Sequence, residues 1–318
     1  MTDEKIFKII FVNILLLLIS GFILEVCSYF LCLNYFHFPP KFWGCTNENI
    51  HQTWMDLRDN NNNITHFAKK PILFLGCSYT YGQGIEKDED TFPSVVEKIT
   101  NRKCYNYGVV SFGPESALFL FDQKRYLSPL LKDKPEYIIY TFMFDHLQRN
   151  DQWRCFNSYR RHNLYPKQKY NFAYKFWTVQ YIQNMKMQKY FNSFDNKDRV
   201  DFFFSCLKTI KKECDSLFPD SKFIVLLSYD INKDLNPRLY GENNEHKKSI
   251  DELFEIMYSK EFKERFKDMG ISVVSTEDLI GRKMDKAKDR IPNDTNQPHP
   301  SVSACEEIAP ALIKYYNL

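Results

Sequence analysis

Hydrophobic and polar positions along this chain predict strands and helices in alternation. Short apolar runs of strand length occur at 72–75, 103–107, 137–142, 222–228 and 270–274. Apolar residues at helical spacing predict helices at 91–99, 114–131, 200–218 and 247–269, and a last helix that runs to Leu318. Strands that alternate with helices favour a parallel sheet with right-handed crossovers. We therefore predict an α/β fold, a three-layer α/β/α sandwich with a five-stranded, flavodoxin-like sheet.

The amino-terminal segment is apolar over a much longer stretch than any of these strands. Residues 9–24 are interrupted only by Asn13, Ser20 and Gly21, and the apolar character continues to Leu33. This length is sufficient to span a bilayer. A cleavable signal peptide has a shorter apolar region and a small-x-small cleavage site, which this segment lacks. The sequence therefore favours an uncleaved transmembrane helix.

Lysines flank the apolar run on one side only. Lys5 and Lys8 precede it, and no Lys or Arg follows before Lys41. The positive-inside rule then predicts a cytoplasmic amino terminus. We expect the rest of the chain to lie outside the membrane, in a periplasmic or extracellular space.

The composition changes again after the apolar run. Pro39 and Pro40 end the predicted helix, and a polar, Asn-rich stretch precedes the first strand. An aromatic-rich insertion at about 146–200 is longer than a βα unit requires, which predicts a helical subdomain with its own core or a lid beside the site. The expected division is an anchor at 1–40, a linker at 41–70 and one catalytic domain at 71–318.

Charge and cysteine content exclude several other classes of protein. The chain has 43 Lys and Arg against 40 Asp and Glu, and these residues are dispersed, which argues against a nucleic-acid partner. Nine cysteines occur without a C-x-x-C pair or a Cys/His metal spacing. We expect no metal site and no disulfide framework. The cysteines are expected to be buried apolar residues, with a bridge between Cys206 and Cys214 as the alternative.

A serine turn follows the first apolar strand, in residues 71–84 (PILFLGCSYTYGQG). A serine at the carboxyl end of a buried strand lies where open α/β folds bind ligands, so we expect the Ser78 hydroxyl to be exposed there. Backbone amides nearby can stabilise an oxyanion. Gly82-Gln-Gly84 lacks the third glycine of a dinucleotide fingerprint, and Thr80 replaces the second glycine of the G-x-S-x-G elbow.

Residues 76–82 (GCSYTYG) resemble the Gly-Asp-Ser block of the SGNH (GDSL-type) hydrolases, in a variant common among bacterial envelope members, with Cys77 in the usual aspartate position. Further along the chain, 106–113 (NYGVVSFG) looks like the second block of this family and 143–150 (MFDHLQRN) occupies the place of the third. The pair His299-Pro300, before the last helix, resembles the final block.

The resemblance implies a serine esterase that needs no cofactor. Ser78 is the implied nucleophile, His299 the implied general base, and the amides of Ser78 and Gly108 the implied oxyanion hole. With the membrane anchor, this favours an enzyme that removes or transfers acyl groups, first of all O-acetyl, on an envelope polysaccharide or glycan. The alternative is a catalytically degenerate member that binds a glycan or a partner without turnover.

Two positions depart from the family pattern. Phe144 stands where the third block has its oxyanion-hole asparagine, while Asp145 keeps the aspartate that follows. Asn296 stands three residues before His299, where the family has aspartate, and Asp294 lies two residues further upstream. Either Asp294 is the carboxylate partner of His299, or a Ser-His dyad works with Asn296.

Overall fold

The protein is described from a computed structural model of the chain. The described residues are 3–36, 57–58, 60, 62, 64, 67, 69–110, 113–148, 182, 185–186, 189–191, 193–228, 244–285, 288–291 and 299–318. The chain divides into two compact units, Met1–Trp54 with Tyr165–Ser193, and Met55–Leu164 with Phe194–Leu318. The predicted insertion at about 146–200 lies largely outside the described residues.

Five parallel strands form one sheet in the second unit. They are β1 (Lys69–Gly76), β2 (Arg102–Gly108), β3 (Tyr137–Phe142), β4 (Lys222–Leu227) and β5 (Ser272–Ser275). Their order across the sheet is β2-β1-β3-β4-β5, which is the flavodoxin-like order and confirms the predicted fold class. In such a sheet the order reverses between β1 and β3, and ligands bind outside the carboxyl ends of these strands.

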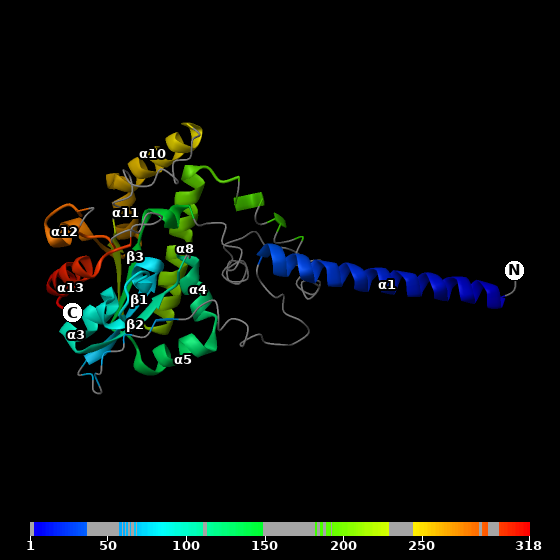
Figure 1. Ribbon diagram of the computed structural model, residues 1–318, viewed down its shortest axis with the longest axis horizontal. Coiled ribbons are helices and arrows are strands. Elements are labelled where there is room, and N and C mark those ends of the chain that lie inside the picture. Colours follow the sequence, from blue (N-terminus) through cyan, green and yellow to red (C-terminus); the bar gives the residue numbers. More distant parts are fainter. Residues whose placement is uncertain are drawn as a thin grey trace. The chain divides into compact units, whose positions relative to one another are not determined.

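One face of the sheet is covered by α3 (Phe92–Thr100) and α13 (Val302–Tyr316), as Figure 1 shows. Alternate strand residues such as Phe74 and Ile139 form a core with Val96 and Leu312 from these helices. Alternation places the intervening strand residues on the opposite face. This core fixes the start of α13 beside the carboxyl edge of the sheet.

The opposite face is covered by an aromatic layer from α8 (Asn196–Leu217) and α11 (Lys260–Asp268). The Phe142 ring lies 5.0 Å from that of Phe203 and 5.7 Å from that of Phe262. Rings at these separations and tilts bury large areas in favourable edge contacts. Much of the high aromatic content is therefore core packing.

Two helices that the hydrophobic spacing predicts as single are each split, so these two predictions are wrong. The first consists of α4 (Glu115–Phe121) and α5 (Lys124–Asp133), separated where Gln123 takes an extended backbone. The second consists of α10 (Asn244–Tyr258) and α11, where the Ser259 hydroxyl accepts from the Phe262 amide at 3.1 Å and caps the new helix. Apolar spacing continues across both breaks, so the periodicity does not reveal them. A short helix, α12 (Thr276–Ile280), follows β5.

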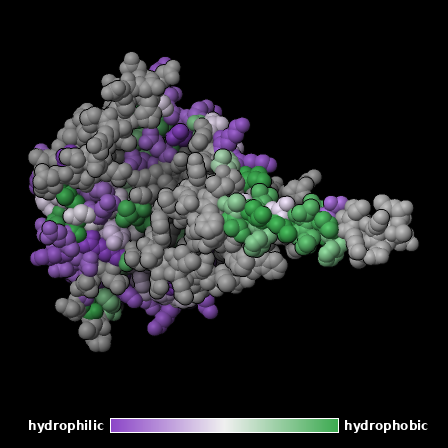
Figure 2. Space-filling model, turned by 45° about the vertical axis from the view of Figure 1, so that its right-hand side comes forward, coloured by the Kyte–Doolittle hydropathy of each residue, from purple (hydrophilic) through white to green (hydrophobic). Residues whose placement is uncertain are grey.

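In the first unit, α1 (Asp3–Phe36) contains a stretch that is long and apolar enough to cross a membrane. Its window Phe11–Ser28 has a mean hydropathy of 2.2 and is 6% buried. Figure 2 shows hydrophobic side chains over this part of the surface. Length and composition fit the predicted anchor, and a signal sequence would have the same properties. Its sidedness stays a prediction.

Part of the predicted linker is packed on the sheet domain. The Asn60 side chain donates to Glu97 Oε2 (2.9 Å) and to the Cys104 carbonyl (2.7 Å), and Asn62 donates to Glu97 Oε1 (2.8 Å). The second compact unit correspondingly begins at Met55, before β1.

Cys206 and Cys214 are free, fully buried thiols of α8. Burial raises the pKa of both. Both cysteines are thus buried as small apolar residues, which is the interpretation that the sequence favoured over a bridge between them.

Candidate active site

Strand β1 brings Ser78 to the carboxyl edge of the sheet. The chain turns at Cys77 into the short helix α2 (Ser78–Tyr81), whose Tyr81 amide donates to the Cys77 carbonyl at 2.9 Å. The Gly82 amide donates to the Ser78 carbonyl at 3.0 Å and closes the turn in a left-handed conformation. The Ser78 turn, defined as residues 77–85, therefore has its backbone fixed by local hydrogen bonds.

Gly108, at the end of β2, is the residue that lets the neighbouring strand approach this turn. A Cβ atom there would lie 2.3 Å from the Tyr81 nitrogen and 2.8 Å from the Cys77 carbonyl oxygen. Only glycine fits such a backbone approach. The Gly108 amide donates to Asn106 Oδ1 at 3.2 Å. As an oxyanion donor, this amide would have to exchange the Asn106 oxygen for that of the substrate.

The Ser78 side chain is buried rather than exposed, which corrects the expectation of an exposed hydroxyl. The residue is 1% exposed. Its Oγ has no hydrogen-bond partner among the described residues. Nearby, Cys77 Sγ contacts Met143 Sδ at 3.0 Å, and these two residues form a small buried cluster with Tyr79. A substrate carbonyl reaches Ser78 Oγ only when the groups that cover it move.

Phe144 packs in the core and supplies no hydrogen-bond donor to the site. It begins η3 (Phe144–Leu147), is 0% exposed, and stacks on Phe254 of α10 with ring centroids 4.1 Å apart. The adjacent Asp145 is 5% exposed. The hydrophobic contact explains how an apolar residue is tolerated where the family has asparagine.

His299 lies next to the residue that follows Ser78. Its ring centroid is 5.5 Å from that of Tyr79, and the residue is 4% exposed. Its carbonyl accepts from the Ile291 amide at 3.0 Å, and Arg290 and Pro300 form an antiparallel bridge. The fold thus places His299 beside Tyr79, the neighbour of Ser78 in the chain, although the two segments are far apart in the sequence. Asp294 and Asn296 lie outside the described residues.

The two parts of the site also touch through Ile291. A Cβ atom on Gly84, in the Ser78 turn, would lie 2.6 Å from Ile291 Cδ1. Ile291 donates its amide hydrogen to the His299 carbonyl, so this contact joins the serine half of the site to the histidine half.

Arg58 is a site residue that the sequence did not indicate. Its guanidinium donates to the carbonyls of Gly82 (2.5 Å) and Ile85 (2.7 Å) and to Asp88 Oδ1 (2.5 Å). It therefore holds the far side of the Ser78 turn. A lone arginine in a polar stretch before the first strand gives no sequence signal for this contact.

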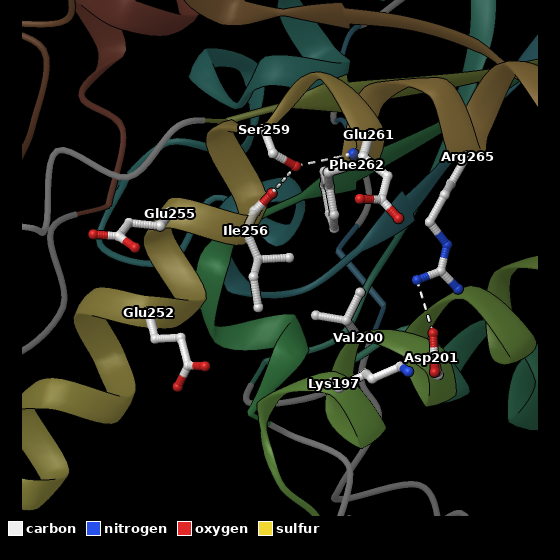
Figure 3. Close-up of a pocket in the computed structure, with 10 residues that line it drawn as sticks. All are labelled: Lys197, Val200, Asp201, Glu252, Glu255, Ile256, Ser259, Glu261, Phe262 and Arg265. Carbon is white, nitrogen blue, oxygen red and sulfur yellow. Dashed lines mark hydrogen bonds and ion pairs between the residues drawn. The ribbon is translucent and has the colours of Figure 1, made fainter.

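A pocket of about 460 Å³ lies between α8, α10 and α11 (Figure 3). Its lining residues include the carboxylates of Asp201, Glu252, Glu255 and Glu261, and Arg265 pairs with Asp201 at 2.8 Å. Ser78, Gly108 and His299 are not among its lining residues. It is therefore separate from the candidate active site.

Among the described residues, no group of three or more His, Cys, Asp or Glu side chains could hold a metal ion.

No protein-family model and no curated protein matches this sequence. Solved structures do match it. A lipolytic protein of the G-D-S-L family from Desulfitobacterium hafniense is 13% identical, covers 77% of this chain and 99% of its own, and has a TM-score of 0.42. The chain is thus similar to this G-D-S-L lipolytic protein, at low sequence identity.

Two further structures illustrate the range of this likeness. A G-D-S-L lipolytic protein from Veillonella parvula is 12% identical over 78% of this chain and 98% of its own, with a TM-score of 0.42. A family two carbohydrate esterase from Clostridium thermocellum, in complex with cellohexaose, is 13% identical over 79% of this chain and 66% of its own, with a TM-score of 0.42. At this identity the similarity concerns the fold, and no residue role is taken from it.

Proposed function

We propose that this chain is an SGNH-type serine ester hydrolase or acyltransferase with Ser78 as nucleophile and His299 as general base. The observation that carries the proposal is the contact between the ring of His299 and that of Tyr79, the residue adjacent to Ser78, at 5.5 Å. A nucleophile at a strand end and an imidazole from a distant segment are the two groups that acyl transfer requires.

The reaction proceeds in two halves. Ser78 Oγ attacks the acyl carbonyl while His299 takes the hydroxyl proton, and the negative charge on the carbonyl oxygen is stabilised by the amides of Ser78 and Gly108. The imidazolium then protonates the leaving alcohol, which gives the acyl-enzyme. In the second half, His299 takes a proton from water, or from an acceptor hydroxyl in a transferase, and that oxygen attacks the acyl carbon. The ester bond to Ser78 then breaks, and the imidazolium returns the proton to Ser78 Oγ.

The oxyanion hole of this enzyme has fewer donors than the family pattern provides. The Phe144 side chain has no hydrogen-bond donor and stacks on Phe254, and the Gly108 amide is engaged with Asn106. Loss of one donor costs about 3 kcal/mol of transition-state stabilisation, so we expect a slow enzyme that is still active.

The proposed substrate is an acyl group, first of all O-acetyl, on an envelope glycan. The apolar helix α1 fits a membrane anchor by length and composition, and a domain tethered outside the membrane would meet surface polysaccharides. The second candidate function is binding of a glycan or partner without turnover, which the Phe144 and Asn296 departures favour.

The test uses the full chain in detergent. A fluorophosphonate probe should label Ser78, and aryl esters and acetylated glycans should be turned over. Ser78→Ala should abolish both labelling and turnover with an unchanged melting temperature, because the small side chain makes no hydrogen bond among the described residues. Turnover that survives in Ser78→Ala contradicts the mechanism. Glycan binding without labelling or turnover supports the second candidate.

The proposed topology has its own test. Protease added to intact cells or spheroplasts should digest the domain, and extraction of the protein should need detergent. A protected domain, or one that is released in soluble form, contradicts an outward, anchored arrangement.

A further inference from the structure

Arg282 connects two carboxylates from different elements, and we propose that it is a positioning residue that holds His299 beside Ser78. The inference rests on the proposed function, because a position matters only if His299 acts on Ser78. Arg282 follows Gly281, which ends α12 in a left-handed conformation.

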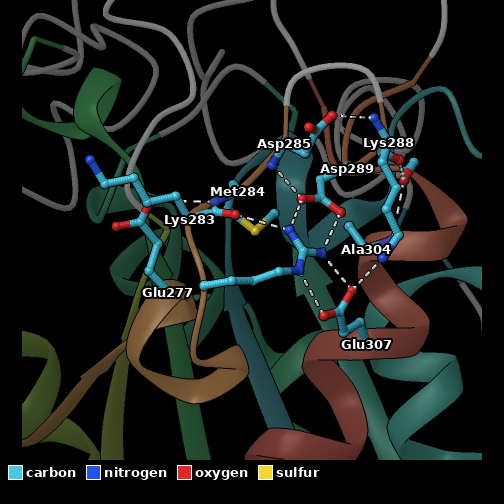
Figure 4. Close-up of polar contacts among 10 residues, drawn as sticks. Glu277, Lys283, Met284, Asp285, Lys288, Asp289, Ala304 and Glu307 are labelled. Carbon is cyan, nitrogen blue, oxygen red and sulfur yellow. Dashed lines mark hydrogen bonds and ion pairs between the residues drawn. The ribbon is translucent and has the colours of Figure 1, made fainter.

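The guanidinium makes paired hydrogen bonds to two carboxylates (Figure 4). Toward Asp289 it donates from Nη1 to Oδ2 (2.6 Å) and from Nη2 to Oδ1 (2.9 Å). Toward Glu307 of α13 it donates from Nε to Oε1 (2.9 Å) and from Nη2 to Oε2 (2.5 Å). Lys288 Nζ also donates to Glu307, at 2.9 Å. Only the planar fork of arginine satisfies two carboxylates in this way.

Asp289 is hydrogen-bonded to the backbone segment that contains His299. Its carbonyl accepts from the Ser301 amide at 2.9 Å, and two residues later Ile291 donates to the His299 carbonyl at 3.0 Å. These two bonds flank the Arg290 to Pro300 bridge and form a short antiparallel ladder. A shift of Asp289 therefore moves the backbone of His299.

The segment of the ladder that contains His299 and Ser301 is fixed to α13. Ser301 is the N-cap of this helix, and its Oγ accepts from the Ala304 amide at 3.1 Å and donates to the Lys288 carbonyl at 2.8 Å. Because Glu307 lies on the same helix, Arg282 fastens Asp289 to the element that begins directly after His299. Both segments of the ladder are therefore held by hydrogen bonds, one at Asp289 and the other at Ser301.

The carboxylates of Asp289 and Glu307 are ionised near neutral pH, because both have lowered pKa values. Burial alone would raise the pKa of Asp289, which is 0% exposed, but hydrogen bonds from Arg282 and from the Asp285 amide outweigh it and lower the pKa. Hydrogen bonds from Arg282 and then Lys288 lower the pKa of Glu307 to about 2. Without Arg282, a buried carboxylate loses its cation, and it must take up a proton or move toward water. Either response disturbs the ladder.

The test compares Arg282→Gln, Arg282→Lys and Glu307→Gln with a matched control in the full chain. The control is Arg265→Gln, which breaks the Arg265–Asp201 pair, because the Arg265 side chain is 33% exposed and that of Arg282 is 31% exposed. Two properties are measured: kcat and KM with an aryl acetate, and the rate constant and final extent of fluorophosphonate labelling of Ser78.

We expect Arg282→Gln to lower kcat and the labelling rate constant about 100-fold, because a misplacement of about 1 Å has that cost. KM should change less than about threefold and labelling should still reach completion, since the site remains present in every folded molecule. Arg282→Lys keeps the charge but loses the fork, so its rate should lie between those of Arg282→Gln and the wild type. The control should stay within about twofold of the wild type.

Several outcomes overturn the inference. One is an Arg282→Gln rate equal to that of the control, and another is a reduced labelling extent with an unchanged rate constant, which indicates a structural role only. If Arg282→Gln does not fold, Glu307→Gln takes its place in the test. We expect Glu307→Gln to lower kcat and the labelling rate constant about 10-fold. Values equal to those of the control would contradict the inference. Failure of the proposed function is recognised separately, since Ser78→Ala would then retain turnover or the wild type would show neither labelling nor turnover.

Discussion

The two halves of the candidate site are each held by one arginine, but through different acceptors. Arg58 binds the backbone carbonyls of Gly82 and Ile85 in the Ser78 turn, and the carboxylate that it contacts, that of Asp88, lies outside that turn. Arg282 binds the side-chain carboxylates of Asp289 and Glu307 in the histidine half. The serine half is therefore secured by main-chain geometry, and the histidine half by charge.

This difference predicts which perturbations should affect each half of the site. Carbonyl oxygens do not titrate, so the Ser78 turn depends on close backbone packing, as at Gly108. The His299 ladder depends on carboxylates that are ionised only above their pKa values. The halves meet where Ile291 touches Gly84, so damage to one can reach the other.

The largest effect should come from the carboxylate partner of His299. If Asp294 orients the imidazole, Asp294→Asn lowers kcat by about 10⁴, because an amide holds the wrong tautomer, whereas Asn296→Ala has little effect. Steady-state kinetics of both variants decide between the two residues. The reverse pattern assigns the role to Asn296, and no loss from either contradicts a third triad member in this loop.

Gly108→Ala should damage the serine half by overpacking. The added Cβ meets backbone atoms at 2.3 and 2.8 Å, and we expect about 3 kcal/mol of destabilisation with loss of Ser78 labelling. Gly281→Ala is the control, since its Cβ meets nothing within 4 Å and only its positive φ costs about 1 kcal/mol. Denaturant unfolding measures both. Equal destabilisation in the two variants would show that the Gly108 approach is looser than described.

Arg58→Gln should loosen the Ser78 turn more mildly. Because Gly82 still closes the turn through its own bond to Ser78, we expect about a 10-fold lower labelling rate constant. Asp88→Asn removes only the carboxylate contact of Arg58 and should cost less than Arg58→Gln. If both variants lower the rate equally, the contact with Asp88 matters more than the carbonyl contacts, and the contrast between the halves fails.

The smallest expected effect is on thermal stability at low pH. The pKa of Glu307 is lowered in the folded protein to about 2, below the unfolded value of about 4.3, so its stabilisation is present above pH ~4.3 and is lost as pH falls toward 2. Asp289 contributes with the same sign. The melting temperature of Glu307→Gln should therefore fall less between pH 5 and 3 than that of the wild type, with Gly281→Ala as a control for lower stability alone. Parallel curves contradict this expectation.

Much of the fold follows from local patterns in the sequence. Five apolar runs and the helical periods between them predicted the parallel sheet and its order, because burial of alternate and every third or fourth residue leaves few other arrangements. The spacing did not predict the breaks at Gln123 and Ser259, because apolar residues continue across both. Capping and backbone conformation at single residues decided these boundaries.

For the site, the sequence by itself determined that Ser78 follows the first strand in a glycine-bounded turn, since that depends on residues adjacent in the chain. Only the tertiary structure decided that His299 lies beside Tyr79, that the Ser78 hydroxyl is buried, and that Phe144 packs on Phe254. Arg58 and Arg282 likewise showed no motif. Their partners are distant in sequence or are backbone carbonyls, and contacts of that kind exist only after the chain has folded.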